Sequence, residues 1–443
     1  MNRQPYGNPP RWWEPQLTPV FMRLTGWYRW WRLHTNQKLT GVDARGYEHL
    51  HRALAEGKGV LITPNHSVHY DAAAFYTSMD RIGQPAYYMT AWQVFAMVNP
   101  FQQWIMQKLG AFSVDRESND RQAFKQGVAV LKSEPYPLVI FPEGDVYHVS
   151  DHVTTFREGA AAIALSAAKR GERPIVVIPC GIKFRYVDDP SKQLAAAALE
   201  LEERILLRPL PDRPLPERLY RLAECILALK EIDHLGRTFT GTVKDRSQAL
   251  SQAILSRLES RHKIRDNGGT TPERVKALRQ CIIRKRADIT TAAGNGAAAG
   301  DGAATSEQAI ADRSAAGDDD GAALDSESRL RALADEMEDL FFVMQLYSYP
   351  GDYLLGSPSI ERIAETLDKF EEDILGRDLP RVRGRRRVEI LMGEPIEVQC
   401  GDDRRGAVER LTKTMEEAVQ GLLDQLSARS ASPTSAELKP SAA

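Results

Sequence analysis

A histidine and an aspartate five positions apart, His66 and Asp71, follow an apolar run that ends at Thr63. The run predicts a strand and the residues after it predict a helix, so both side chains lie at a strand end, where open α/β sheets place their sites. An imidazole oriented by a carboxylate can take a proton from a hydroxyl group near neutral pH. The pair therefore predicts general-base chemistry, although this spacing alone is common.

Three further blocks follow this pair along the chain. They are Gly110–Arg116 (GAFSVDR), Phe141–Gly144 (FPEG) and Val177–Ile182 (VIPCGI). The last two contain or follow β-branched apolar runs, which are typical of buried strands.

In this order the four blocks resemble the glycerolipid acyltransferase family, whose motifs are N-H-x-x-x-x-D, a Gly-x-x-x-x-Asp-Arg strand end, F-P-E-G and a proline-bearing strand. The resemblance covers Leu39 to Asp189, and Val388–Ile396 is similar to a late strand that these proteins often carry. It implies that a thioester of coenzyme A or acyl carrier protein donates a fatty acyl group to the hydroxyl of a lysophospholipid resembling 1-acylglycerol 3-phosphate, in phospholipid synthesis. This chemistry needs no metal and no bound cofactor.

The resemblance also implies a role for each matching residue. His66 is the general base, Asp71 orients it, and no acyl-enzyme forms. The remaining matches are expected to contact the substrates, with the proline ending a strand along the acyl pocket: Asn65, Arg116, Glu143, Gly144, Arg157 and Pro179. Two plainer interpretations stay open, namely a surface ion pair of Asp115 with Arg116 and a Glu143 that only binds backbone amides.

The residues after F-P-E-G depart from the family pattern. Many relatives continue with Thr-Arg-Ser, whose arginine contributes to phosphate binding, whereas Asp145-Val146-Tyr147-His148 follows here. Arg116 and Arg157 are the remaining candidates for binding a phosphate group. A lipid acceptor without phosphate is therefore an alternative substrate.

Imidazole and carboxylate side chains at short spacing also suit zinc or iron, which predicts a different class of enzyme, a metal-dependent hydrolase. The candidate ligands are His66, His69, Asp71, His148 and His152. This interpretation leaves the second and fourth blocks unexplained. A lipid-binding or scaffold protein with an inactive site is a third class, against which the intact His66 and Asp71 argue.

The elements that must position these residues follow from the apolar pattern. Residues 39–189 alternate short apolar runs with helical periodicity, which predicts an α/β fold, a mixed sheet flanked by helices. The expected strands and the clearest helix are 59–63, 86–90, 111–115, 138–141, 175–178 and 157–170.

The second half of the chain has a different pattern. Residues 190–386 are predicted to be a helical insertion, within which 290–328 are expected to be disordered because they contain almost no large apolar side chains. The acyltransferase-like domain is expected to resume over 387–426 with a strand and a helix. A disordered tail, 427–443, would complete the chain.

Residues 1–38 predict a basic, tryptophan-rich helix at a membrane interface. They hold five of the seven tryptophans and six Lys or Arg against one acidic residue, Glu14. On a helical projection Thr25 and Arg29 lie opposite an apolar stripe of Val20, Phe21, Leu24, Trp27, Tyr28 and Trp31. The same stripe would also suit packing on the α/β domain. A second basic cluster, residues 381–387, suits anionic lipid, an acidic carrier protein or a solvated linker.

Composition limits the classes of protein. The formal charge of -2 over 443 residues gives no global basic field, so nucleic acid is not an expected partner. The four cysteines form no C-x-x-C pair, which argues against a zinc knuckle and a disulfide framework. We find no signal peptide and no apolar stretch near the roughly 18 residues that span a bilayer. These features predict a cytoplasmic enzyme bound peripherally to the inner face of the membrane.

Overall fold

The computed structural model describes residues 10–117, 120–169, 173–265, 268–298, 317–348, 351–377, 379–399 and 404–430. Contacts divide the chain into two compact units. The first comprises Met1–Leu222 and Leu354–Ala443, and the second is Ala223–Tyr353.

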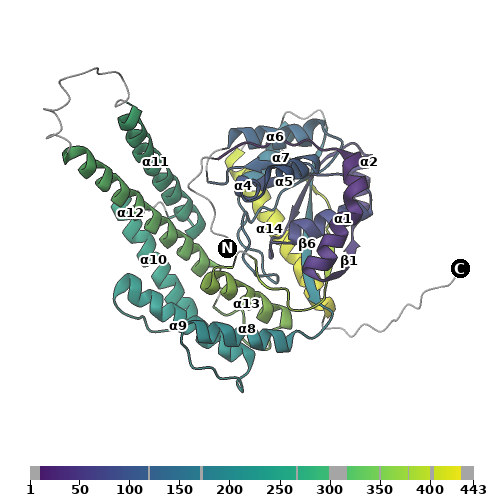
Figure 1. The fold of residues 1–443 in the computed structure, drawn as a ribbon. Coiled ribbons are helices and arrows are strands. Elements are labelled where there is room, and N and C mark those ends of the chain that lie inside the picture. The colour runs from purple at the N-terminus through teal and green to yellow at the C-terminus, as the bar shows by residue number, and fades with distance from the viewer. Residues whose placement is uncertain are drawn as a thin grey trace. The chain divides into compact units, whose positions relative to one another are not determined.

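The first unit is built around one mixed sheet (Figure 1). Its strands are β1 (Leu39–Arg45), β2 (Gly59–Pro64), β3 (Tyr87–Ala91), β4 (Ala111–Val114), β5 (Leu138–Val139), β6 (Ile175–Tyr186), β7 (Arg386–Met392) and β8 (Ile396–Glu397). In the described part of the chain their order is β1-β7-β6-β2-β5-β3-β4, with β8 beside β6. β6 is antiparallel to β7 and β8, and the other neighbouring pairs are parallel. The predicted fold class, a mixed sheet in an α/β domain, is confirmed.

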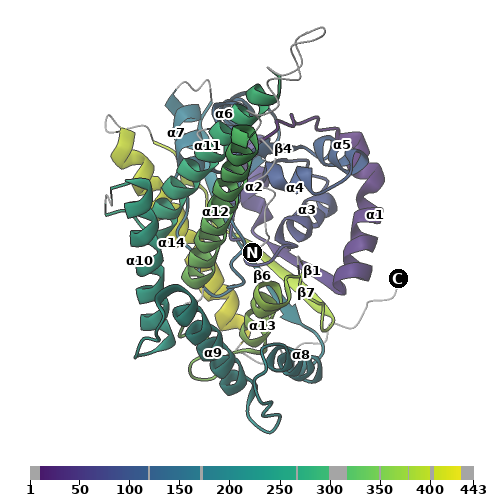
Figure 2. The ribbon, with the colours of Figure 1, turned by 60° about the vertical axis from the view of Figure 1, so that its left-hand side comes forward.

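Helices cover both faces of this sheet (Figure 2), and a hydrophobic core lies on each face. Alternate residues of β2 therefore pack into two different cores. Val60 and Ile62 pack with apolar side chains of α1 (Pro19–Gln37), α2 (Tyr47–Ala55), α3 (Asp71–Arg81) and α4 (Trp92–Ala96). Leu61 packs with those of α6 (Arg121–Ser133), α7 (Gly159–Lys169) and α14 (Arg404–Ser430). A strand buried on both faces has a continuous apolar sequence, which is why β2 was recognisable.

The predicted strands correspond to β2 to β6 and the predicted helix 157–170 to α7. β6 is longer than expected and contains Pro179, so the prediction that this proline ends a strand is wrong. On the side of β8 and β7, β6 pairs through Val176–Val177 and then from Cys180 onward. Pro179 lies where the partner strand changes: its carbonyl oxygen accepts from the Gly393 amide, but it has no N–H to donate in return.

Two helices that follow β6 in sequence also belong to the first unit. α8 (Ser191–Arg204) and α13 (Ile360–Leu375) pack against each other, and α13 also contacts β6. Ser359 caps α13 by accepting a hydrogen bond from Arg362 N. The first unit therefore takes helices from both ends of the region predicted to be an insertion.

The second unit is helical. α10 (Val243–His262), α11 (Thr271–Ala298) and α12 (Gly317–Tyr347) pack on one another, and α9 (Leu215–Leu235) extends across the boundary into this unit. An ion pair of the buried Glu231 with the partly buried Arg246, 2.7 Å apart, links α9 to α10 inside the unit. Ala223–Tyr353 is shorter than the predicted insertion of residues 190–386.

Several predicted features fall wholly or partly outside the described residues: residues 1–9, residues 299–316 of the segment expected to be disordered, Cys400, and residues 431–443 of the tail. α11 extends into the start of that segment as far as Ala298, and α12 begins within it at Gly317. Alanine, which is frequent there, is the strongest helix former, so helices that begin in packed sequence can continue into it. None of the described helices combines the length and the apolar character that crossing a bilayer requires.

Candidate active site

The loop between β2 and α3 carries His66, and the first residue of α3 is Asp71. Asp71 Oδ2 accepts hydrogen bonds from His66 Nδ1, 3.2 Å away, and from the Val68 amide, 2.8 Å away. The carboxylate therefore closes the loop and orients the imidazole at once. It is fully buried, whereas 19% of the His66 side chain is exposed. Because a carboxylate only accepts, Nδ1 carries the hydrogen and Nε2 is left to take a proton.

Glu143 of the F-P-E-G block lies behind this loop. Its Oε1 accepts from the His66 amide at 2.6 Å, and its Oε2 accepts from the amide and the hydroxyl of Thr154. Burial raises the pKa of Glu143 to about 7, although these hydrogen bonds oppose the shift. The plainer interpretation of Glu143, a side chain that binds backbone amides, matches these contacts. The amide that it holds is that of the candidate base.

Two arginines meet at the turn of the same block. Gly144 has φ +75°, and a Cβ at this position would lie 2.4 Å from Arg157 Nε, so only glycine lets Arg157 approach. Arg116 Nη1 donates to the Gly144 carbonyl oxygen and lies 3.6 Å from Asp145 Oδ1. Its Nε is buried and has no acceptor among the described residues. The structure therefore brings both candidate phosphate ligands to one turn.

The alternative in which Arg116 pairs with Asp115 does not match the contacts found. Asp115 Oδ1 accepts from the Glu117 amide instead. The carboxylate nearest to Arg116 is Asp145, which directly follows the F-P-E-G block.

Asn65 directly follows β2, and Pro179 lies within the neighbouring strand β6. The buried Asn65 side chain donates to the Ile182 carbonyl oxygen at 3.1 Å and accepts from the Ile182 amide at 2.7 Å. These two bonds fasten the start of the His66 loop to β6. Pro179 accepts from the Gly393 amide at 2.9 Å. Contact of either residue with substrate stays a prediction.

Residues 41–183 match the family model described as Acyltransferase. They form an acyltransferase domain of the glycerolipid acyltransferase family. The matched segment contains the His66–Asp71 pair, Glu143 and both arginines. No curated protein matches the chain.

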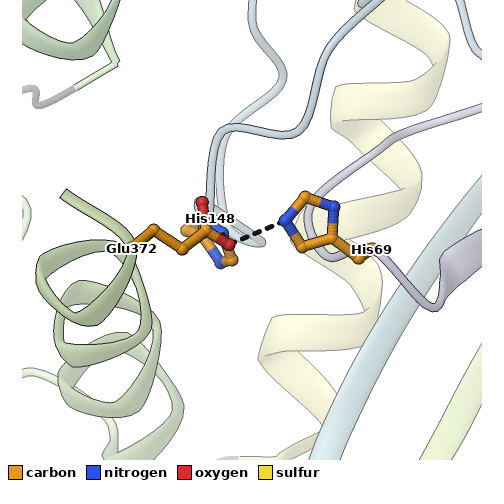
Figure 3. Close-up of side chains that lie close together, drawn as sticks. All are labelled: His69, His148 and Glu372. Carbon is orange, nitrogen blue, oxygen red and sulfur yellow. Dashed lines mark hydrogen bonds and ion pairs between the residues drawn. The ribbon is translucent and has the colours of Figure 1, made fainter. Parts of the chain in front are cut away.

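A second cluster adjoins the His66 loop of the acyltransferase domain (Figure 3). Glu372, on α13, lies outside the matched segment, and its Oε1 bonds His69 Nε2 at 2.7 Å and His148 Nε2 at 2.8 Å. The ring centroids of His69 and His148 are 5.5 Å apart. His148 also donates its amide hydrogen to the Ser67 carbonyl oxygen, at 3.1 Å. The cluster thus joins the His66 loop, the segment after F-P-E-G and α13.

Electrostatics differ among the members of this cluster. Burial opposes ionisation of Glu372, but the neighbouring His148 and His69 prevail and lower the pKa of this carboxyl below its usual range. Burial also lowers the pKa of His69, although the bond to Glu372 opposes that shift. Together the shifts favour an ionised carboxylate beside a neutral His69.

Sequence reasoning missed Glu372, because it lies 303 residues from His69. The one local signal is that α13 buries several acidic side chains among its apolar ones: Glu365, Asp368, Glu371 and Glu372. That pattern indicates buried partners but does not identify them. Glu365, one of these acids, accepts from the Ser150 amide, and Arg362 pairs with Asp151, so α13 holds the segment after F-P-E-G at three points.

The ligand set considered for a metal-dependent hydrolase does not form one cluster. Within the described residues, the group of His, Cys, Asp and Glu near enough to share a metal ion is His69, His148 and Glu372, whose ligand atoms lie within 4.8 Å of one another. His66 and Asp71 form a separate pair. His152 is exposed.

The basic cluster at 381–387 is engaged in ion pairs. Arg381 pairs with Glu200, and Arg385 pairs with Asp188. Arg383 is buried between Asp368 and Glu371 of α13. These contacts weaken its candidacy as a binding surface for lipid or a carrier protein.

Proposed function

We propose that the acyltransferase domain moves a fatty acyl group from a thioester of coenzyme A or acyl carrier protein to the hydroxyl of a lysophospholipid at the cytoplasmic membrane surface. The observation that carries the proposal is the hydrogen bond from His66 Nδ1 to the buried Asp71, at the end of β2. This geometry fixes the tautomer in which Nε2 is a base.

The pair supports a direct transfer. His66 Nε2 takes the proton of the acceptor hydroxyl as its oxygen attacks the thioester carbonyl carbon, and Asp71 stabilises the resulting imidazolium. The tetrahedral intermediate then breaks its C–S bond, and His66 returns the proton to the departing thiolate. The products are an ester and a free thiol, so no acyl-enzyme is required.

Arg116 and Arg157 support an acceptor that carries a phosphate group. Guanidinium groups bind phosphate oxygens through charge-assisted, often paired hydrogen bonds. The buried Nε of Arg116 has no acceptor among the described residues, which leaves a donor for such a group. We therefore favour a 1-acylglycerol 3-phosphate-like acceptor over a neutral lipid, even though the family's Thr-Arg-Ser sequence is absent.

An exposed apolar surface supports a route to lipid. α1 packs on the domain through Met22 and through Arg29, which bonds Asp80 of α3 at 2.7 Å. The predicted stripe lies on the outer side of α1, where Trp27 is 72% exposed and Trp31 is 53% exposed. Exposed aromatic and aliphatic side chains on an amphipathic helix are typical of an interfacial contact.

The same surface continues beyond the predicted stripe. Phe21 of α1 contacts Trp104 of α5 (Pro100–Lys108), with ring centroids 5.4 Å apart. We define the membrane-facing surface by the exposed apolar residues of α1, of α4 with its C-cap, and of α5: Val20, Leu24, Trp27, Tyr28, Trp31, Val94, Met97, Phe101 and Trp104. Arg23 and Arg32, both exposed, are the basic residues of α1 that suit anionic headgroups.

The proposal is tested by acyl transfer from acyl-coenzyme A and from acyl carrier protein to a panel of lipids. The panel pairs 1-acylglycerol 3-phosphate with 1-acylglycerol, which differ only in the phosphate. We expect the phosphate-bearing lipid to be the better acceptor. Equal rates for the pair would contradict the phosphate assignment, and thioester hydrolysis without transfer to any lipid would contradict the function itself.

A further inference from the structure

The side chains of His69, His148 and Glu372 converge from three separate parts of the first unit (Figure 3). His69 lies in the loop before α3, His148 follows F-P-E-G, and Glu372 lies on α13. The exposed fractions of the side chains are 13% for His69, 0% for His148 and 1% for Glu372. The cluster is therefore enclosed by protein and is almost closed to solvent.

The three ligand atoms are of the kinds that zinc prefers. Two imidazole nitrogens and one carboxylate oxygen are a common set of protein ligands for this ion, which then has one further position. All three atoms lie within 4.8 Å of one another. Ligand atoms around a tetrahedral zinc are about 3.3–3.6 Å apart, since each lies about 2.0–2.2 Å from the ion.

Two of the three separations are shorter than in that arrangement, by less than about 1 Å. Glu372 Oε1 lies 2.7 Å from His69 Nε2 and 2.8 Å from His148 Nε2. Zinc would displace the hydrogen that each Nε2 donates to Oε1, so each neutral ring would carry its hydrogen on Nδ1 instead, and side-chain movements of less than about 1 Å would bring the three atoms to zinc-binding distances. Both histidines already direct the same ring nitrogen at one oxygen atom, so no ring has to turn over.

We infer that His69 Nε2, His148 Nε2 and Glu372 Oε1 form a zinc site that fastens α13 to the two active-site loops. The ion is separate from the proton transfer, because His66 bonds Asp71 and neither of these residues belongs to the ligand set. Its role is structural, and the site does not depend on the proposed acyl transfer. Binding ties together loops that the chain itself joins only through long connections.

The test measures zinc bound to the purified full-length protein. The protein is stripped by dialysis against a chelator, equilibrated with limiting Zn²⁺, and analysed by elemental mass spectrometry and by competition with a chromophoric chelator. We expect about one zinc per chain. His69→Ala and Glu372→Ala should each weaken binding by more than the roughly 10- to 100-fold that loss of an outer-shell partner costs.

Two further variants guard against misfolding and unspecific binding. Glu372→Gln keeps the side-chain shape and an oxygen for the imidazoles but loses the charge, so it should fold and still bind zinc weakly. His152→Ala removes an exposed histidine near the same segment and should bind zinc like the wild type. A wild type that takes up no zinc, or a folded Glu372→Gln variant with undiminished zinc affinity, would overturn the inference.

Discussion

His66 and His69 lie in one loop, and each bonds a carboxylate, yet the two carboxylates differ in origin. The partner of His66 is Asp71, from the helix that the same loop begins. The partner of His69 is Glu372, from a helix 303 residues further on, and this carboxylate is shared with His148. His66 thus depends on local chain geometry, whereas His69 depends on the assembly of the first unit.

This difference separates two tasks. A general base must keep one ring nitrogen unengaged and reach the substrate, and His66 retains some exposure and contacts the Phe141 ring at 4.6 Å between centroids. A structural contact does best when it is closed to solvent, as at His148. Removing the local carboxylate should therefore affect turnover, and removing the remote one should affect how the loops are held.

The sharpest way to break this comparison is to replace each carboxylate by its amide. Asp71→Asn should lower kcat by roughly 10²-fold or more with little change in KM, because a misoriented imidazole no longer acts as a base. Glu372→Gln should lower kcat less and should lower the melting temperature more. Steady-state kinetics and calorimetry on both variants decide the matter, and equal kcat losses would remove the distinction.

Glu143 is a third carboxylate that contacts the His66 loop, and its burial disfavours the ionised form. Burial raises its folded pKa to about 7, above the ordinary value of 4.5. The folded state therefore binds more protons between these values, and this group makes the protein less stable as pH rises through that window. Through this group the wild type should lose roughly 2–3 kcal/mol of unfolding free energy between pH 4.5 and 7, and Glu143→Gln should not show this loss. Denaturant unfolding of both proteins across this pH range measures the difference. The same dependence of unfolding free energy on pH in wild type and variant would contradict the prediction.

Substitution of an arginine at the Gly144 turn tests whether the active site binds the phosphate group of the acceptor. Arg116→Ala should raise KM for a phosphate-bearing acceptor by about 10-fold or more, the usual value of a charged hydrogen bond, and should leave a neutral acceptor unaffected. Arg121→Ala, which removes an exposed arginine at the start of α6, is the matched control. A uniform effect of Arg116→Ala on both acceptors would assign this residue a structural role.

The membrane-facing surface should give the smallest effect on the purified enzyme. Trp27→Ala with Trp31→Ala should weaken liposome sedimentation at all salt concentrations, while Arg23→Glu with Arg32→Glu should weaken it mainly at low salt. Neither pair should lower stability much, because all four side chains are exposed. Trp30→Ala is the contrast, since this partly buried ring packs on the first core and under Arg81. Unchanged binding with a large fall in melting temperature for the Trp27 and Trp31 pair would make the stripe a packing surface.

The sequence was informative where the physical cause is local. The apolar run of β2 is continuous because both its faces are buried, and Asp71 meets His66 because five residues of loop suffice to return the chain. Gly144 was recognisable through F-P-E-G, and the close approach of Arg157 explains why a glycine stands there. These features depend on few neighbours, so a motif preserves them.

Other features depend on contacts between distant segments and could not be derived in this way. Glu372 is one of several acids on α13, and no local pattern separates it from those that bind arginines. Pro179 looked like the end of a strand because the exchange of β8 for β7 beside β6 is set by tertiary pairing. The arginines at 381–387 looked like a free basic patch because their acidic partners are far away in sequence.

The most direct test of the central claim, that His66 is the base of an acyl transfer, is the rate of ester formation by His66→Ala. Purified wild type, His66→Ala and His152→Ala are assayed with an acyl thioester and the best acceptor from the lipid panel. Calorimetry first establishes that the three proteins have the same melting temperature. We predict that His66→Ala loses nearly all transfer, by at least the roughly 10²-fold of lost acid-base catalysis, while His152→Ala keeps the wild-type rate. A wild-type rate in His66→Ala would contradict the mechanism.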